Sequence, residues 1–223
     1  NSTYFCGHTY HFKDHDYNCT GSHGDIAVTQ ALRVSCNIFF YKLSEELTID
    51  RITEYASKFG LGQSTGLETG DAAGHLSNQE TFAELGADWT VGQVLQSAIG
   101  QGEWAVTPLQ MANVACTIAN NGLNPVTKQQ VFEPSLSPKI TSLIATVGFY
   151  EHTGDWLYTS GVPAKSGVGG GVLGVIPGLF GIAAFAPPLD EAGNSVKAQA
   201  AIKYIAQKLN VNVFGGDQIE ISR

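Results

Sequence analysis

Residues 163–186 read PAKSGVGGGVLGVIPGLFGIAAFA, and this stretch decides the fold class. Its apolar runs cover 163–168, 171–176 and 180–186, and glycines or prolines separate each run from the next. Short apolar runs interrupted in this way are typical of antiparallel strands joined by tight turns. A further run at 156–161 has the same character, so we predict a meander of four short strands.

Apolar residues recur at helical spacing on both sides of this meander. The predicted helices lie at 25–35, 38–47, 50–60, 90–99, 108–119, 138–146 and 195–209. Asp25, Asp50 and Thr107 are good N-cap residues, and Asn121-Gly122 ends the fifth helix. Residues 1–24 are predicted to form a loop or an irregular hairpin, and residues 61–89 a loop. Helices packed on an antiparallel sheet define an α+β protein, here predicted as a single domain over 1–223.

The composition favours a globular chain and excludes some partners. Hydrophobic residues make up 43% of the sequence and charged residues 14%, which is enough apolar material for a sizeable core. The net charge of −8 argues against binding to nucleic acid or to anionic membrane surfaces. The sequence shows no membrane-spanning segment and no leader, so we expect neither.

The four cysteines fall into two groups. Cys36 and Cys116 lie in apolar helical patterns and are predicted to be core thiols. Cys6 and Cys19 flank a polar, His-rich segment, and three interpretations stay open for them: a disulfide-closed hairpin, a zinc site, or free surface cysteines. Because their spacing matches no standard zinc signature, the sequence leads us to predict no metal site, and it indicates no cofactor.

Six short motifs follow one another along the first half of the chain. They are His23-Gly24-Asp25-Ile26, Ala31-Leu32, Ser35-Cys36-Asn37-Ile38-Phe39-Phe40-Tyr41, Phe59-Gly60-Leu61-Gly62 with Thr65-Gly66, Ala98-Ile99-Gly100-Gln101-Gly102, and Thr107-Pro108-Leu109-Gln110-Met111-Ala112. In order and spacing they resemble the transpeptidase domain of high-molecular-weight penicillin-binding proteins, over residues 3 to about 122. That resemblance implies a β-lactamase/transpeptidase-like fold, incomplete at its N-terminus.

The second half resembles a different family. Its motifs are Ala119-Asn120-Asn121-Gly122-Leu123-Asn124-Pro125-Val126-Thr127, Gly148-Phe149-Tyr150, Pro163-Ala164-Lys165-Ser166-Gly167-Val168-Gly169-Gly170-Gly171, Pro177-Gly178, Pro187-Pro188-Leu189-Asp190 and Gly193-Asn194-Ser195. They look like the C-terminal half of a serine-dependent glutaminase. The two families share a fold, so we interpret the chain as a recombined or engineered chimera, with a natural divergent member as the alternative. Residues 1–118 would form the part similar to penicillin-binding proteins, and residues 119–214 the part similar to glutaminases. Residues 215–223 would be a tail.

The resemblances imply a set of site residues. Ser35 would relay a proton and Asn37 would bind the substrate amide, as in the Ser-x-Asn motif of transpeptidases. Lys165 would be an electrostatic anchor and Ser166 a carboxylate-binding hydroxyl, as in a Lys-Ser-Gly strand. Gly167, Val168 and Tyr150 match substrate-binding positions. Val168 and Tyr150 correspond to glutaminase positions that contact glutamine. For Lys165 a solvated turn lysine remains the structural alternative.

The nucleophile of this chemistry is not found in the sequence. A Ser-x-x-Lys helix start needs a hydroxyl three residues before a lysine, and none of the nine lysines has Ser or Thr there. We therefore expect the chain as written to be inactive as an acyl-transfer enzyme. Two alternatives stay open: a serine acyl-transfer enzyme of transpeptidase or glutaminase type with an unusual nucleophile such as Ser35, and a non-catalytic module that binds a carboxylate ligand.

The expected partners follow from the same two resemblances. They are small molecules or peptides with a carboxylate, namely a β-lactam, a D-Ala-D-Ala stem or glutamine. A missing N-terminal part of the fold would expose a sheet edge and apolar surface, and pairing with a second copy would cover them. The front half resembles extracytoplasmic enzymes and the back half cytosolic ones, so the compartment stays open.

Overall fold

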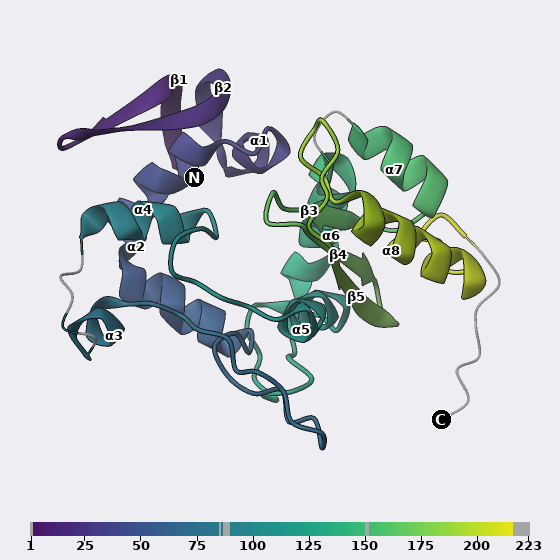
Figure 1. Cartoon of the computed structure of the whole chain (residues 1–223). Coiled ribbons are helices and arrows are strands. Elements are labelled where there is room, and N and C mark those ends of the chain that lie inside the picture. Colours follow the sequence, from purple (N-terminus) through teal and green to yellow (C-terminus); the bar gives the residue numbers. More distant parts are fainter. Residues whose placement is uncertain (1, 85, 87–89, 150–151, 216–223) are drawn as a thin grey trace. The chain divides into compact units, whose positions relative to one another are not determined.

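The computed structural model describes residues 2–84, 86, 90–149 and 152–215, and it divides the chain into two compact units (Figure 1). Unit 1 comprises Asn1–Val106 and unit 2 comprises Thr107–Arg223. Together they show the predicted α+β class, with helices and antiparallel sheets. None of the described helices is long and apolar enough to cross a membrane.

Unit 1 begins with a long antiparallel hairpin rather than a loop. Its strands are β1 (Thr3–Phe12) and β2 (His15–Ala27). The register shifts between Cys6 and Gly7 and again between Gly7 and Thr9, so the hairpin is irregular. The predicted N-cap at Asp25 is wrong, because Asp25 still pairs with β1 opposite Phe5, and the following helix begins only after Ala27.

The helices of unit 1 are α1 (Val28–Arg33), α2 (Asn37–Lys58), α3 (Gln79–Glu84) and α4 (Val91–Ala98). Two helices were expected over 38–60, and the structure joins them as α2 with a kink at Thr48, which has φ 63° and ψ 158°. The predicted loop at 61–89 contains α3, whose start is fixed by Asn78, since the Thr81 backbone N–H donates to Asn78 Oδ1 at 2.9 Å.

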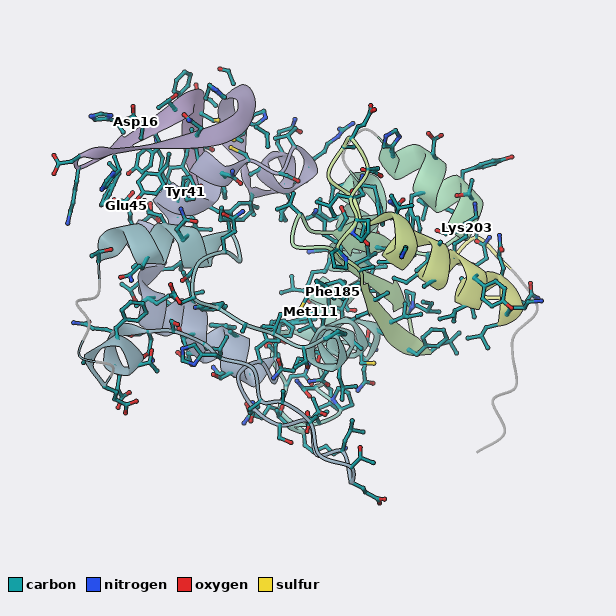
Figure 2. All side chains as sticks on the ribbon, viewed as in Figure 1. Asp16, Tyr41, Glu45, Met111, Phe185 and Lys203 are labelled. Atoms are coloured by element: carbon teal, nitrogen blue, oxygen red, sulfur yellow. The ribbon has the colours of Figure 1, made fainter. Side chains whose placement is uncertain are left out.

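The core of unit 1 lies between the hairpin and α2. Tyr41 of α2 packs edge-on against Tyr17 of β2 with ring centroids 5.5 Å apart, and Phe39 does the same against Tyr4 at 5.1 Å. The Tyr10 hydroxyl on β1 donates to the Glu45 carboxylate on α2, close to Tyr41 (Figure 2). These contacts hold the hairpin on the first half of the helix.

Unit 2 is built on a three-stranded antiparallel sheet in the order β3-β4-β5. The strands are β3 (Ala164–Ser166), β4 (Gly171–Ile176) and β5 (Phe180–Phe185), which confirms three of the four predicted runs. The fourth prediction, a strand at 156–161, is wrong: these residues belong to helix α7 (Thr153–Ser160), which ends at Gly161 with φ 65°. The buried Trp156 stacks on Phe149 there, and its indole N–H donates to Val162 O, so tertiary packing overrides strand propensity.

Helices cover both faces of this sheet. The remaining elements are α5 (Pro108–Ala119), the 3-10 turn η1 (Pro134–Leu136), α6 (Ser137–Val147) and α8 (Val196–Lys208). Val172 and Ile176 of β4 point to one face of the sheet and share a core with α8. Val175 points to the opposite face and packs with α5. Ser195 caps α8 and Thr107 caps α5, the latter as predicted.

Candidate functional site

The Lys-Ser-Gly segment lies at the edge of the unit 2 sheet. Lys165 pairs with Leu173 and Ser166 with Val172 across β3 and β4. Ser166 is buried, whereas Lys165 is half-buried and Gly167 is exposed. Lys165 is the middle residue of β3, within the strand predicted over 163–168, so it is not a solvated turn lysine.

The outer side of β3 is held by the loop after α6. Gly148 O accepts the Ser166 backbone N–H at 3.0 Å and lies 3.1 Å from the Ser166 hydroxyl. Gly148 can lie this close because a Cβ at this position would be 1.8 Å from Ala164 O. The glycine thus provides the close backbone approach that fixes the Lys-Ser-Gly strand in place.

Asn194 completes the surroundings of Ser166, although no role was predicted for it. The Ser166 hydroxyl lies 2.6 Å from Asn194 Oδ1, and Asn194 N donates to Asp190 Oδ1 at 2.8 Å. Asn194 is fully buried, and its Nδ2 has no hydrogen-bond partner among the described residues. The Gly193-Asn194-Ser195 motif was the signal that could have identified it, since a buried Asn beside a site hydroxyl orients that hydroxyl.

A neighbouring turn carries the other two predicted binding positions. Gly167 N–H donates to Gly171 O at 2.9 Å, and Gly170 N–H donates to Gly167 O at 2.9 Å. Val168 projects from this turn with 53% of its surface exposed. Tyr150 lies outside the described residues.

The Lys165 ammonium group is kept close to its own strand. Its Nζ donates to Ser166 O at 2.6 Å. Burial lowers the pKa of Lys165 to about 8, because the charged form loses its hydration. At neutral pH the side chain is still mainly protonated, and in this half-buried position its charge attracts an anion more strongly than it would in water.

This shifted lysine makes the stability of unit 2 depend on pH. The pKa of Lys165 is about 8 in the folded chain, and its ordinary value of 10.5 applies when unfolded. Between these values the unfolded chain binds a proton that the folded chain has lost, so the free energy of unfolding rises with pH across this window. The rise is at most about 3 kcal/mol, the equivalent of the pKa difference. Urea unfolding of the wild type and of Lys165→Met from about pH 7 to about pH 11 measures it.

The contribution of Lys165 is the difference between the two pH profiles. Lys165→Met is expected to be the more stable chain below about pH 8, and the difference should shrink as the pH rises. Lys197→Met is the matched control, because Lys197 is exposed on α8. Parallel profiles for wild type and Lys165→Met would show that Lys165 titrates normally.

Ser35 and Asn37 belong to unit 1. Ser35 lies between α1 and α2 with φ 50°, and its hydroxyl oxygen is buried without a hydrogen-bond partner among the described residues. Asn37 is the first residue of α2, and its Nδ2 donates to Asn18 O at 3.4 Å. Lys165, Ser166, Gly167 and Val168 belong to unit 2, so the predicted site residues are divided between the two units.

The glutaminase family model matches residues 50–214. The match begins in α2, well before residue 119, where the glutaminase-like part was predicted to start. A glutaminase of Parabacteroides distasonis is 70% identical over 116 residues, which are 52% of this chain and 36% of the relative. A glutaminase of Escherichia coli O81 is 45% identical over 111 residues, 50% of this chain and 36% of the relative. The chain thus spans about a third of the length of these curated relatives.

The similar solved structures include glutaminases and also a protein that shares only the fold. The probable glutaminase ybaS is 38% identical with a TM-score of 0.53, over 60% of this chain and 44% of its own. The Bacillus subtilis glutaminase YbgJ, in covalent complex with 5-oxo-L-norleucine, is 27% identical with a TM-score of 0.51. This match covers 60% of this chain and 49% of the YbgJ chain. Pseudomonas aeruginosa PBP2 shares the fold, with a TM-score of 0.78 at 23% identity. This match covers 100% of this chain and 56% of the PBP2 chain. These matches and the Lys-Ser-Gly strand show that the chain belongs to the glutaminase family, within the β-lactamase/transpeptidase-like fold.

Proposed function

We propose that unit 2 carries the substrate-binding strand of a glutaminase-type serine amidohydrolase and binds the carboxylate of glutamine or glutamate. The observation that carries this proposal is the buried Ser166, fixed between Gly148 and Asn194 beside the protonated Lys165. A lysine held on such a rigid strand offers a charge-assisted hydrogen bond to a carboxylate. Support also comes from the family match over residues 50–214.

Isothermal titration with L-glutamate tests the binding role. We expect saturable binding to the wild type and at least a tenfold weaker affinity, about 1.4 kcal/mol, for Lys165→Ala. Lys197→Ala removes the same charge from an exposed position on α8 and should bind as the wild type does. Equal loss in both variants would point to general attraction by positive charge, and no saturable binding to the wild type would refute the proposal.

We also infer that these 223 residues do not form an acyl-enzyme by themselves. Acyl transfer needs a serine activated by a base, and none of the nine lysines is preceded by Ser or Thr at the third position. Binding groups alone leave only a small part of the rate enhancement of such enzymes. The expected behaviour is therefore ligand binding without release of ammonia from glutamine.

The origin of the two halves is a further part of this proposal. We infer that the chain combines an N-terminal part from a transpeptidase-like branch with a C-terminal part from a glutaminase branch of one fold, and the glutaminase family model matches from residue 50 onwards. The glutaminases of Parabacteroides distasonis and Escherichia coli O81 match 52% and 50% of this chain, which supports a mixed origin. A transpeptidase-type site remains the second candidate, because the buried Ser35 hydroxyl has no partner among the described residues. Labelling with a fluorescent penicillin, expected to be absent, tests it.

A further inference from the structure

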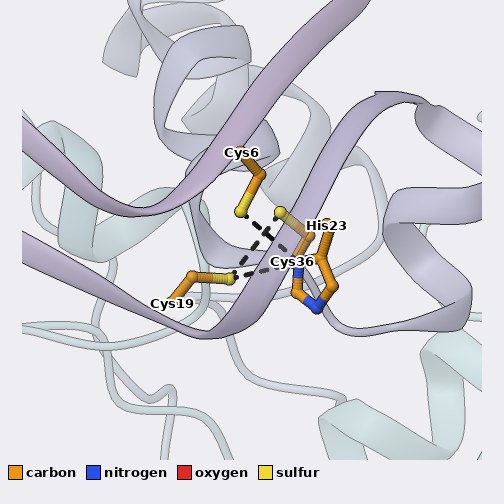
Figure 3. A group of neighbouring side chains, drawn as sticks. All are labelled: Cys6, Cys19, His23 and Cys36. Carbon is orange, nitrogen blue, oxygen red and sulfur yellow. Dashed lines mark hydrogen bonds between the residues drawn. The ribbon is translucent and has the colours of Figure 1, made fainter.

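Four side chains that bind soft metals meet inside unit 1. They are Cys6 from β1, Cys19 and His23 from β2, and Cys36, the N-cap residue of α2 (Figure 3). Their three sulfur atoms and one imidazole nitrogen all lie within 4.8 Å of one another. The three cysteines are buried and His23 is half-buried, so the cluster is part of the core between hairpin and helix.

This arrangement excludes two of the three interpretations of Cys6 and Cys19, the free surface cysteines and the disulfide. Cys6 and Cys19 are buried rather than exposed, which corrects the expectation of free surface cysteines. All four cysteines are free thiols, so the disulfide-closed hairpin is not formed. Cys19 Sγ and Cys36 Sγ are 3.7 Å apart, whereas a disulfide requires about 2.05 Å.

Two of the thiols compete for the same nitrogen atom of His23. His23 Nδ1 faces Cys6 Sγ at 3.4 Å and Cys19 Sγ at 3.6 Å. A ring nitrogen carries either one proton or one lone pair, so it serves one of these two thiols well. A cation at the centre of the cluster would instead accept a lone pair from every one of the four atoms.

Three of the six separations between the ligand atoms match those of a tetrahedral zinc ion, and the other three are no longer than 4.8 Å. Bonds of about 2.3 Å to sulfur and about 2.0 Å to nitrogen, at tetrahedral angles, place two sulfurs about 3.8 Å apart and a sulfur and a nitrogen about 3.5 Å apart. The observed separations are 3.7 Å between the sulfurs of Cys19 and Cys36, and 3.4 and 3.6 Å between sulfur and the His23 nitrogen. Three thiolates and one imidazole are also a recognised ligand set of structural zinc sites, and they disfavour Mg²⁺ and Ca²⁺.

The surroundings of Cys36 suit a metal-bound thiolate. The Phe39 backbone N–H donates to Cys36 Sγ at 3.4 Å, at the first turn of the 22-residue helix α2. Free N–H groups and the positive end of the helix dipole stabilise a negative sulfur at this position. The hydrogen bond from Phe39 N–H orients the Cys36 sulfur and disperses part of its negative charge.

We propose that Cys6, Cys19, His23 and Cys36 form a structural zinc site that joins the β1–β2 hairpin to the start of α2. All four positions of the tetrahedron come from the protein, so the site is closed and has no free position for water or substrate. Its role is to hold three segments of unit 1 together. This proposal is independent of the glutamate-binding strand in unit 2.

Metal analysis of the untagged 223-residue chain is the first test. After folding with zinc and dialysis, we expect about one zinc ion per chain, and thermal unfolding should shift to lower temperature when the zinc is removed. Loading with cobalt should give the intense visible absorption of a tetrahedral cobalt–thiolate site. A wild-type chain that retains less than about 0.1 zinc per chain, or whose cobalt spectrum is weak, would overturn the proposal.

Matched variants locate the site. Cys19→Ser is expected to lose most of the bound zinc and, if cobalt still binds, about a third of the thiolate-to-cobalt absorption, because one of three thiolates is gone. Cys116→Ser is the control, since Cys116 is the fourth cysteine and lies in α5 outside the cluster. His23→Ala keeps all three thiols and should weaken zinc binding at least tenfold. Wild-type zinc content in both Cys19→Ser and His23→Ala would place the metal elsewhere, and if these variants fail to fold, the wild-type cobalt spectrum decides.

Discussion

Replacing Gly148 with alanine is expected to destabilise unit 2 by on the order of 3–5 kcal/mol. The backbone of Gly148 has an ordinary helical conformation, with φ −65° and ψ −32°, so the glycine is not needed for its conformational freedom. A Cβ there would lie 1.8 Å from Ala164 O and 3.2 Å from Ile144 O, both of them backbone atoms that cannot turn aside. The strand that carries Lys165 would have to separate from the end of α6.

The control for this change is Gly154→Ala. Gly154 lies in helix α7, and a Cβ at that position would meet nothing within 4 Å. Because alanine favours a helix over glycine by roughly 1 kcal/mol, this variant should be as stable as the wild type or more so. Thermal unfolding followed by circular dichroism compares the three chains. A Gly148→Ala chain that melts with the wild type would show that β3 is not held as the structure describes.

The second large effect is expected from Phe149→Ala, at about 3–5 kcal/mol. Phe149 has no exposed surface, and its ring stacks on Trp156 with centroids 4.4 Å apart. Truncation leaves a cavity in the core shared by α7, α8 and the sheet. We expect the urea midpoint to fall accordingly, with an unchanged slope if the folded state stays compact.

Phe185 provides the matched control for Phe149. It is the last residue of β5, and 58% of its surface is exposed. Phe185→Ala removes the same side chain but should change the unfolding free energy by less than about 1 kcal/mol. Similar losses in both variants would contradict the assignment of Phe149 to the core.

The sequence predicted the elements whose signals are local. The strands at 171–176 and 180–186 are bounded by glycine and proline, and α5 begins with a capping threonine and ends at Asn121-Gly122. The kink of α2 at Thr48 also lies between the two helices predicted there. In these cases backbone chemistry within a few residues decides the structure.

The errors concern elements decided by distant contacts. Trp156 lies in an aromatic run that resembles a strand, but its stacking on Phe149 and its bond to Val162 O select a helix. For residues 1–24 a loop and an irregular hairpin were both predicted, and aromatic packing on α2 selects the hairpin.

The same limit applies to the candidate sites. Lys165 and Ser166 were found because they share a contiguous motif, whereas Asn194 reaches Ser166 only through the fold. A zinc site at Cys6 and Cys19 was left open but not preferred, because the ligands come from β1, β2 and the N-cap of α2 and match no standard spacing. Cys36 was interpreted as an ordinary core thiol for this reason.

Covalent labelling tests the central claim most directly. The Bacillus subtilis glutaminase YbgJ forms a covalent complex with 5-oxo-L-norleucine on reaction with 6-diazo-5-oxo-L-norleucine. The 223-residue chain, incubated with this compound or with a fluorescent penicillin, should keep its unmodified intact mass while it still binds L-glutamate. A stoichiometric adduct that peptide mapping assigns to a serine, Ser35 above all, would contradict the account and establish an active serine nucleophile within these residues.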